Sequence, residues 1–256
     1  MTTLTVPARF NGPPTSGNGG WTAGAVAEAA GTLGAVPPLT VSLKAPPPLD
    51  VALTLDPDDD GTGWTLTGPL GDDGATAVVA TVRPDAVLVG DDADPGPAVG
   101  VEVAREAASG YAGLRSHPFP TCVVCGPERE PGDGLRIFPG RLPDGPDGLD
   151  ERVAATWTPD PSVADSDGQV GTAVTWAALD CVGGWSSDLE HRPLVLAAMS
   201  AGLEPRQSPP QAGATYVVVG RLVRTEGRKT WTTTGMYDDA GRLVARAQQL
   251  WVAIRS

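Results

Sequence analysis

Two stretches of the chain are apolar on nearly every side of a helical repeat, and each has one acid inside it. Residues 18–31 contain Glu28 as their only charged residue, and residues 171–184 contain Asp180 in the same way. A helix that is apolar all round is normally buried, and a buried carboxylate must either pair or change its pKa. The pattern therefore predicts two buried helices, each with one acid in a nonpolar setting.

The other apolar positions fall mainly in short runs bounded by Pro, Gly and Asp and rich in β-branched residues, as is typical of strands. These runs are 2–10, 39–44, 50–55, 63–67 and 75–82 in the first half, and 134–138, 151–157, 194–200, 214–223, 230–237 and 242–254 in the second. A linker rich in Asp, Pro and Gly lies at 84–100, and the spacing at 101–115 predicts a short amphipathic helix.

A match between two predicted hairpins indicates an internal duplication. The sequence Trp-Thr-Leu-Thr-Gly at 64–68 corresponds to Trp-Thr-Thr-Thr-Gly at 231–235 (231 − 64 = 167), and Ala80 corresponds to Ala247 at the same offset. Glu28 and Asp180 are closer together (180 − 28 = 152), so the second half needs extra residues between its helix and its hairpin. The Pro- and Gln-containing segment 203–213 is the expected place for most of them.

Each half therefore consists of a strand, a buried helix and several antiparallel strands. A helix that is apolar on all sides needs apolar surface around it, which a curved antiparallel sheet supplies. We expect an α+β fold of two repeats, residues 1–95 and 122–256, joined by a linker with a short helix at 96–121.

Particular phrases in the second half resemble the hotdog-fold thioesterase superfamily. Cys122-Val-Val-Cys125-Gly-Pro, followed by Gly-Leu-Arg-Ile from Gly134, is similar to the opening of many hotdog thioesterase domains. Ala-Ala-Leu-Asp180 followed by Gly183-Gly184 resembles their central helix, and residues 239–249 resemble their last hairpin. Over the whole chain the layout is similar to double-hotdog acyl-CoA thioesterases, the first half chiefly through Phe10-Asn-Gly and the Gly19-Gly20 helix start. The resemblance implies a tandem hotdog of two curved antiparallel sheets, each wrapping one apolar helix.

Thioester hydrolysis requires a group that polarises the carbonyl and a carboxylate that attacks it or activates water. Helix N-termini supply unpaired N–H groups and partial positive charge, and Gly allows a substrate to approach closely. The expected oxyanion and substrate-binding residues are Asn18, Gly19, Gly20, Gly171, Thr172 and Trp176. Trp176 either forms a wall of the acyl channel or belongs to the core. Asp180 or Glu28 is the expected nucleophile or general base. The resemblance adds Gln249, where acyl-CoA thioesterases II place a water-orienting glutamine, and Thr215 as a hydroxyl from a neighbouring strand.

The helix starts depart from the His-Gly-Gly that many single-hotdog thioesterases have there. The second half reads Val170-Gly171-Thr172, and the first half keeps Gly-Gly but has Asn18 in place of His. The two helix starts and two acids either combine into one composite site or leave one site degenerate. For Asp180 the alternative is a structural acid, hydrogen-bonded to a loop or on an exposed stripe.

The cysteines allow a metal site only under one condition. A structural zinc site normally has four ligands, and beyond Cys122 and Cys125 the chain offers Cys181, His117 and His191 as nitrogen or sulfur donors. A site of three Cys and one His would require Cys181 to leave the helix core. We therefore expect a metal-free turn at 122–125, a small buried Cys181, and no cofactor.

Composition narrows the function classes. The chain of 256 residues has a formal net charge of −13, which opposes binding to nucleic acid or to an anionic membrane. Three cysteines do not form a disulfide framework, the N-terminus has no signal-peptide pattern, and no apolar run is long enough to span a bilayer, so a cytoplasmic protein is expected.

The expected function is hydrolysis of an acyl-CoA or acyl-carrier thioester by a monomer or homodimer of double-hotdog subunits. A hotdog dehydratase or hydratase is disfavoured, because such enzymes pair an acid with a histidine and neither of the two histidines lies near either of the two apolar helices. The alternative from another class is a non-catalytic protein that binds acyl ligands. Neither the acyl chain nor the choice between CoA and a carrier protein follows from these residues.

Overall fold

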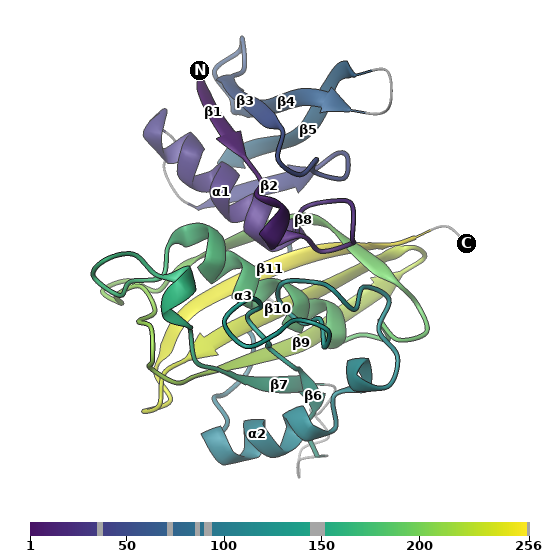
Figure 1. The fold of residues 1–256 in the computed structure, drawn as a ribbon, viewed down its shortest axis with the longest axis vertical. Coiled ribbons are helices and arrows are strands. Elements are labelled where there is room, and N and C mark those ends of the chain that lie inside the picture. Colours follow the sequence, from purple (N-terminus) through teal and green to yellow (C-terminus); the bar gives the residue numbers. More distant parts are fainter. Residues whose placement is uncertain (35–37, 71–73, 85–87, 90–93, 144–151, 255–256) are drawn as a thin grey trace.

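The computed structural model describes residues 1–34, 38–70, 74–84, 88–89, 94–143 and 152–254, and its centre is one antiparallel sheet of eleven strands (Figure 1). The strands follow the order β1-β3-β4-β5-β2-β8-β11-β10-β9-β7-β6 across the sheet. Their bounds are β1 Thr2–Thr5, β2 Leu39–Leu43, β3 Ala52–Pro57, β4 Trp64–Leu70, β5 Ala75–Pro84, β6 Gly140–Arg141, β7 Arg152–Trp157, β8 Leu194–Leu203, β9 Tyr216–Glu226, β10 Lys229–Tyr237 and β11 Leu243–Ala253.

The two halves of the sheet have the same internal order, which fits the duplication inferred from the hairpins. β1-β3-β4-β5-β2 in the first half correspond to β7-β9-β10-β11-β8 in the second. The expectation of two separate sheets is wrong, because β2 pairs with β8 through Thr40↔Ser200, Val41↔Met199 and Ser42↔Ala198. β2 and β8 are the inner edge strands of the two half-sheets, and their pairing satisfies backbone N–H and C=O groups at these edges.

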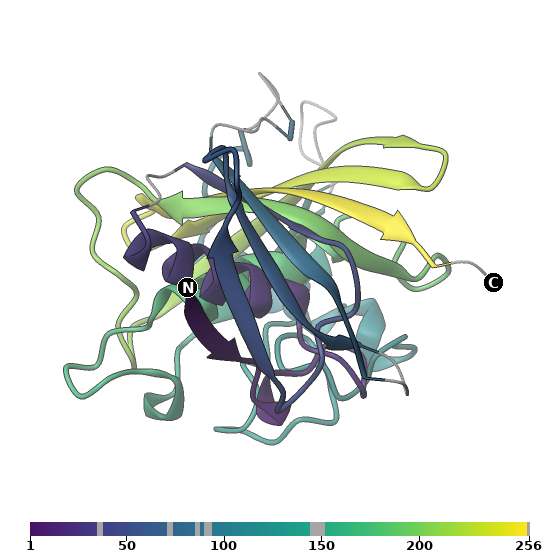
Figure 2. The same cartoon turned by 90° about the horizontal axis from the view of Figure 1, so that it is seen from above.

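Two helices of equal length pack against each other beside this sheet. They are α1, Gly19–Thr32, and α3, Thr172–Trp185 (Figures 1 and 2). Their backbones meet closely because glycine lies at the contact: a Cβ on Gly20 would lie 2.3 Å from the Cβ of Asp180, and one on Gly24 2.8 Å from the Cα of Ala173. The contact therefore brings the first turn of α1 beside the middle of α3.

Alternate residues of the second-half strands enter two different cores. Val153, Ala155 and Val218 belong to the main core that contains α3, whereas Ala154 and Val217 belong to a smaller cluster with helix α2, Val101–Ser109. Successive side chains of a strand point to opposite faces, so α3 and α2 cover opposite sides of the sheet here.

Two sequence expectations about the connecting segment are corrected. The helix expected at 101–115 ends at Ser109, and a short 3₁₀ turn follows at Ala112–Leu114. The strand expected at 134–138 is absent: Arg136 has a positive φ of 53°, and the N–H groups of Leu135 and Ile137 donate to the carbonyls of Val123 and Val124. This segment pairs with the Cys-x-x-Cys turn instead of joining the sheet.

Some expectations fall on residues outside the described ranges. Position 151 of the strand expected at 151–157 and parts of the linker expected at 84–100 are among them. Within the described part of the chain, no helix combines the length and the apolar character that a membrane span requires.

Candidate functional site

An apolar cavity of about 370 Å³ opens where the first turn of α1, the middle of α3 and the start of β8 meet. Its walls come from both halves of the chain and from the connecting segment. The lining residues used below are Asn18, Gly19, Lys44, His117, Cys122, Cys125, Asp180, Cys181, Trp185, Leu196 and Trp251.

Asn18 begins α1 and also reaches into this cavity. Its side-chain oxygen accepts a hydrogen bond of 2.8 Å from the N–H of Trp21, which is the standard N-cap interaction. Its side-chain Nδ2 donates to the carboxylate Oδ2 of Asp180 at 3.0 Å. One buried amide therefore caps the N-terminus of α1 and holds an acid of the other half of the chain.

Asp180 is 2% exposed and is hydrogen-bonded through one oxygen only. Its Oδ2 accepts from the backbone N–H of Gly20 at 3.0 Å as well as from Asn18, whereas its buried Oδ1 has no partner among the described residues. Burial raises the pKa of Asp180 to about 7, although the Gly20 and Asn18 hydrogen bonds oppose the shift. The carboxyl group is thus fixed in orientation and has one oxygen available for a ligand or water.

Gly19 places a further donor at the same cavity. It is the first residue of α1, so its N–H has no acceptor within the helix, and it lines the cavity. A Cβ at this position would lie 2.8 Å from the side chain of Leu196. The absence of a side chain therefore lets β8 approach the helix start and leaves the N–H near the acid.

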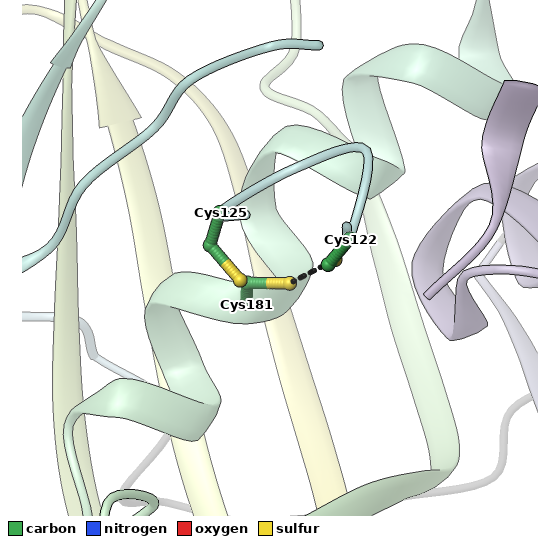
Figure 3. A group of neighbouring side chains, drawn as sticks. All are labelled: Cys122, Cys125 and Cys181. Carbon is green, nitrogen blue, oxygen red and sulfur yellow. Dashed lines mark hydrogen bonds between the residues drawn. The ribbon is translucent and has the colours of Figure 1, made fainter. Parts of the chain in front are cut away.

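Three buried cysteines form one wall of the cavity. Their sulfur atoms all lie within 4.8 Å of one another, with Cys122 and Cys125 on a turn over α3 and Cys181 on the helix itself (Figure 3). The Sγ atoms of Cys122 and Cys181 are 3.7 Å apart, and the Nε2 of His117 is 3.4 Å from the Sγ of Cys125. The expectation that Cys181 would have to leave the helix core to join the other two is wrong, because the turn comes to the helix.

Glu28 does not occupy the position that corresponds to Asp180. The two helices begin 153 residues apart (172 − 19 = 153), and the Thr22 and Thr175 hydroxyls donate to the carbonyls of Asn18 and Gly171 in the same way. This offset pairs Asp180 with the buried Ala27 and turns Glu28 by about 100° around the helix, where it is exposed. The prediction of a buried Glu28 is therefore wrong.

The second helix start lies in a different place from the first. Thr172 and Trp176 line a separate cavity of about 440 Å³ together with Glu28. Gly171, the N-cap of α3, is exposed and makes no side-chain capping bond. The structure thus separates Glu28, Thr172 and Trp176 from the group formed by Asn18, Gly19, Gly20 and Asp180.

Gln249 lies behind α3 and not among the residues that line the first cavity. It is 0% exposed; its Nε2 donates to the carbonyl of Leu179 and the hydroxyl of Thr234, both at 2.9 Å, and its Oε1 accepts from Thr232 at 2.8 Å. Its amide therefore connects β10 and β11 to α3 by hydrogen bonds.

Thr215 is also outside the lining of both cavities. It lies before β9, and its hydroxyl is 3.1 Å from that of Thr158.

The sequence pattern missed that His117 and the Cys122–Cys125 turn line the same cavity as Asp180. His117 lies 64 residues before Cys181, in a loop with no motif, so its position depends on the connecting segment. The signal that was present is the Cys-x-x-Cys phrase together with a third cysteine beside Asp180.

Comparison with known proteins supports the fold. No family model matches the chain, and no curated protein matches it. A conserved protein of unknown function with a hotdog fold from Alicyclobacillus acidocaldarius is 14% identical, with a TM-score of 0.57 over 99% of this chain and 93% of that one. The chain therefore has the hotdog fold.

Two further solved structures resemble parts of the chain. The Escherichia coli PaaI protein from the phenylacetic acid degradation operon is 11% identical, with a TM-score of 0.40 over 48% of this chain and 82% of that one. A Streptococcus mutans protein solved with acetyl-CoA is 16% identical, with a TM-score of 0.37 over 41% of this chain and 82% of that one.

Proposed function

We propose that this hotdog protein hydrolyses acyl thioesters in the cavity between the first turn of α1 and Asp180. The observation that carries the proposal is the buried Asp180 carboxyl, held through Oδ2 by both Gly20 and Asn18 while Oδ1 has no partner among the described residues. Burying a carboxyl group costs free energy. A buried acid in an apolar cavity, with one oxygen free to hydrogen-bond, is typical of a group that acts on a ligand.

The proposed organisation is a tandem hotdog, with repeats at 1–95 and 122–256 and a linker at 96–121. The helix start and the acid of the site come from different repeats. One chain therefore supplies both parts, and a monomer is sufficient for activity; a homodimer of such subunits adds nothing that the site requires.

In the proposed mechanism the thioester carbonyl lies beside the first turn of α1. Asp180 takes a proton from a water molecule while the water oxygen attacks the carbonyl carbon. The electron pair of the C=O double bond moves onto the carbonyl oxygen. The N–H of Gly19 and the positive end of the helix dipole stabilise that oxyanion. When the intermediate collapses, the C–S bond breaks and the thiolate receives the proton from Asp180.

The cavity favours the acyl end of the substrate. Its lining includes Trp185, Leu196 and Trp251, which suit a hydrocarbon or aromatic acyl group. Lys44 is the only Lys or Arg among the described lining residues, and the chain carries a formal net charge of −13. Recognition of the many phosphates of CoA therefore rests on few cations, so the substrate panel includes both acyl-CoA and short acyl-pantetheine thioesters.

The test is thiol release from short, medium, long and aromatic acyl thioesters by wild type, Asp180→Asn and the matched control Glu28→Gln. We expect Asp180→Asn to lower kcat/KM by about 10²- to 10⁴-fold, the range for loss of a general base, while Glu28→Gln stays near wild type. The melting temperature of Asp180→Asn is expected to stay equal or rise, because an amide avoids the desolvation cost of a buried carboxylate. Activity retained in Asp180→Asn would exclude this mechanism.

A second candidate function is a binding protein for acyl ligands without turnover. The observation that favours it is that Asp180 already uses the Gly20 N–H and the Asn18 amide, two donors that an oxyanion would otherwise take. For a binding protein, the intact acyl thioester is expected to raise the melting temperature, and none of the acyl thioesters tested is expected to release thiol.

A further inference from the structure

We propose that Cys122, Cys125 and Cys181 form a metal site that binds one Zn²⁺ through three thiolates, with its fourth coordination position facing the cavity. Thiolate is the ligand that zinc prefers among soft donors, and three protein ligands with an open position form a recognised type of zinc site. The proposal concerns metal binding and does not depend on thioester hydrolysis.

The distances between the sulfur atoms match a single tetrahedral ion. Two sulfurs at ~2.3 Å from one zinc ion lie about 3.8 Å apart. The Sγ atoms of Cys122 and Cys181 are 3.7 Å apart, and all three sulfurs lie within 4.8 Å of one another. A shift of about 1 Å or less by a side chain on the turn therefore completes the geometry.

The turn that carries Cys122 and Cys125 is built to point sulfur at the helix. The N–H of Gly126 donates to the carbonyl of Cys122 at 2.9 Å, and a Cβ on Gly126 would lie 2.4 Å from the carbonyl oxygen of Pro120. The turn brings the Sγ of Cys122 to 3.7 Å from the Sγ of Cys181 on α3.

A hydrogen-bond donor, the side-chain amide of Asn18, lies beside two of the sulfurs. The Nδ2 of Asn18 lies 3.9 Å from the Sγ of Cys122 and 3.8 Å from the Sγ of Cys181. Three thiolates and one Zn²⁺ leave a net charge of −1, which such donors stabilise in a buried place.

His117 is placed to serve Cys125 and not the metal. Its Nδ1 accepts from the N–H of Phe119 at 2.8 Å, so in the neutral ring the proton is on Nε2, which then donates toward the Cys125 sulfur 3.4 Å away. His117 is therefore a positioning residue, and the fourth metal position is left for water or another ligand from the cavity.

The test is titration of the reduced, metal-free protein with Co²⁺ under anaerobic conditions, followed by competition with Zn²⁺. We expect one Co²⁺ per chain and sulfur-to-cobalt charge-transfer bands that Zn²⁺ abolishes. The chain has three cysteines, so every thiolate contribution comes from this cluster. Native mass spectrometry of the wild type with Zn²⁺ measures the same stoichiometry without any substitution.

Variants separate ligands from the positioning residue. Cys122→Ser, Cys125→Ser and Cys181→Ser should each reduce the charge-transfer intensity, whereas His117→Ala should keep the bands and weaken binding by about 10- to 100-fold. Reduced wild type that gives no thiolate–cobalt bands and no zinc adduct would overturn the proposal, as would a His117→Ala variant that loses the metal completely while its cysteines stay reduced.

Discussion

The two helix starts of this chain have nearly the same backbone and very different chemistry. At α1, Asn18 caps the helix and, with Gly20, holds the buried Asp180 of the other half. At α3, the exposed Gly171 makes no side-chain capping bond and the nearest candidate acid, Glu28, is exposed. The two halves thus share the packing of their helices, whereas the buried acid and its donors occur at one of the two helix starts.

The two hairpins differ in the same way. Gln249 of β11 and Val82 of β5 lie 167 residues apart (249 − 82 = 167), and the strand registers place them opposite Thr232 of β10 and Trp64 of β4. Both are buried, but Gln249 makes three hydrogen bonds to α3 and β10, whereas Val82 packs as hydrocarbon in the core. The second half therefore attaches its helix by polar contacts that this position of the first half lacks.

The close contact between the helices predicts the largest loss of stability. In Gly20→Ala the added methyl group would lie 2.3 Å from the Cβ of Asp180 and 2.9 Å from the carbonyl oxygen of Trp176, so α1 must move away from α3. We expect a decrease of about 3 kcal/mol in the free energy of unfolding. Urea denaturation measures it.

Gly31 of the same helix is the matched control. A Cβ there meets nothing within 4 Å, so Gly31→Ala should stabilise the protein by ~0.5–1 kcal/mol through helix propensity. Equal effects of the two substitutions would show that the crossing of the two helices is not tightly packed.

The polar attachment of β11 predicts an intermediate loss. Gln249→Leu leaves the Thr232 and Thr234 hydroxyls and the Leu179 carbonyl without their amide partner, which should cost about 2 kcal/mol. Because Gln249 does not line the cavity, thiol release per folded molecule should not change. A lowered kcat/KM with unchanged stability would restore the water-orienting role that the family resemblance implies.

The missing cap of α3 predicts the smallest effect. Gly171→Asn supplies the side chain that Asn18 gives to α1, and a Cβ at this position meets nothing within 4 Å. We expect a gain of a few tenths of a kcal/mol in the free energy of unfolding. Gly171→Ala, which cannot cap, should be less stable than Gly171→Asn, and the reverse order would contradict the comparison of the two helix starts.

Much of the fold follows from local patterns. Helix α1 and most strands lie within a few residues of the ranges that hydrophobic periodicity and turn residues predict. The pattern fails where the chain is neither a helix nor a strand. The segment at 134–138 has strand-forming residues, but Arg136 adopts a positive φ, and the backbone of the segment hydrogen-bonds to the Cys-x-x-Cys turn. The residue types of a short segment do not show which distant part of the chain accepts its hydrogen bonds.

The candidate site was predictable in its parts. Asp180, Asn18, Gly19 and Gly20 stand out in the sequence because one acid in an apolar helix and a Gly-rich helix start are unusual locally. The sequence left open whether the two helix starts and the two acids combine into one site or leave one site degenerate. The structure brings Asn18, Gly19 and Asp180 to one cavity and places Glu28 and Thr172 at another. The equivalence of Glu28 with Asp180 failed because a shift of one residue turns a side chain by about 100° on a helix.

Hydrophobic periodicity and turn residues are enough to predict two apolar helices, each with one acid, and a repeated antiparallel hairpin, but not that Glu28 is exposed while Asp180 is buried. These features depend on residue periods of two and 3.6 and on turn chemistry, which are local properties. Contacts between distant parts of the chain join the two half-sheets, bring the acid of one half to the helix start of the other and gather the three cysteines. Such contacts depend on how close two backbones can come, and glycines at the crossing set that distance.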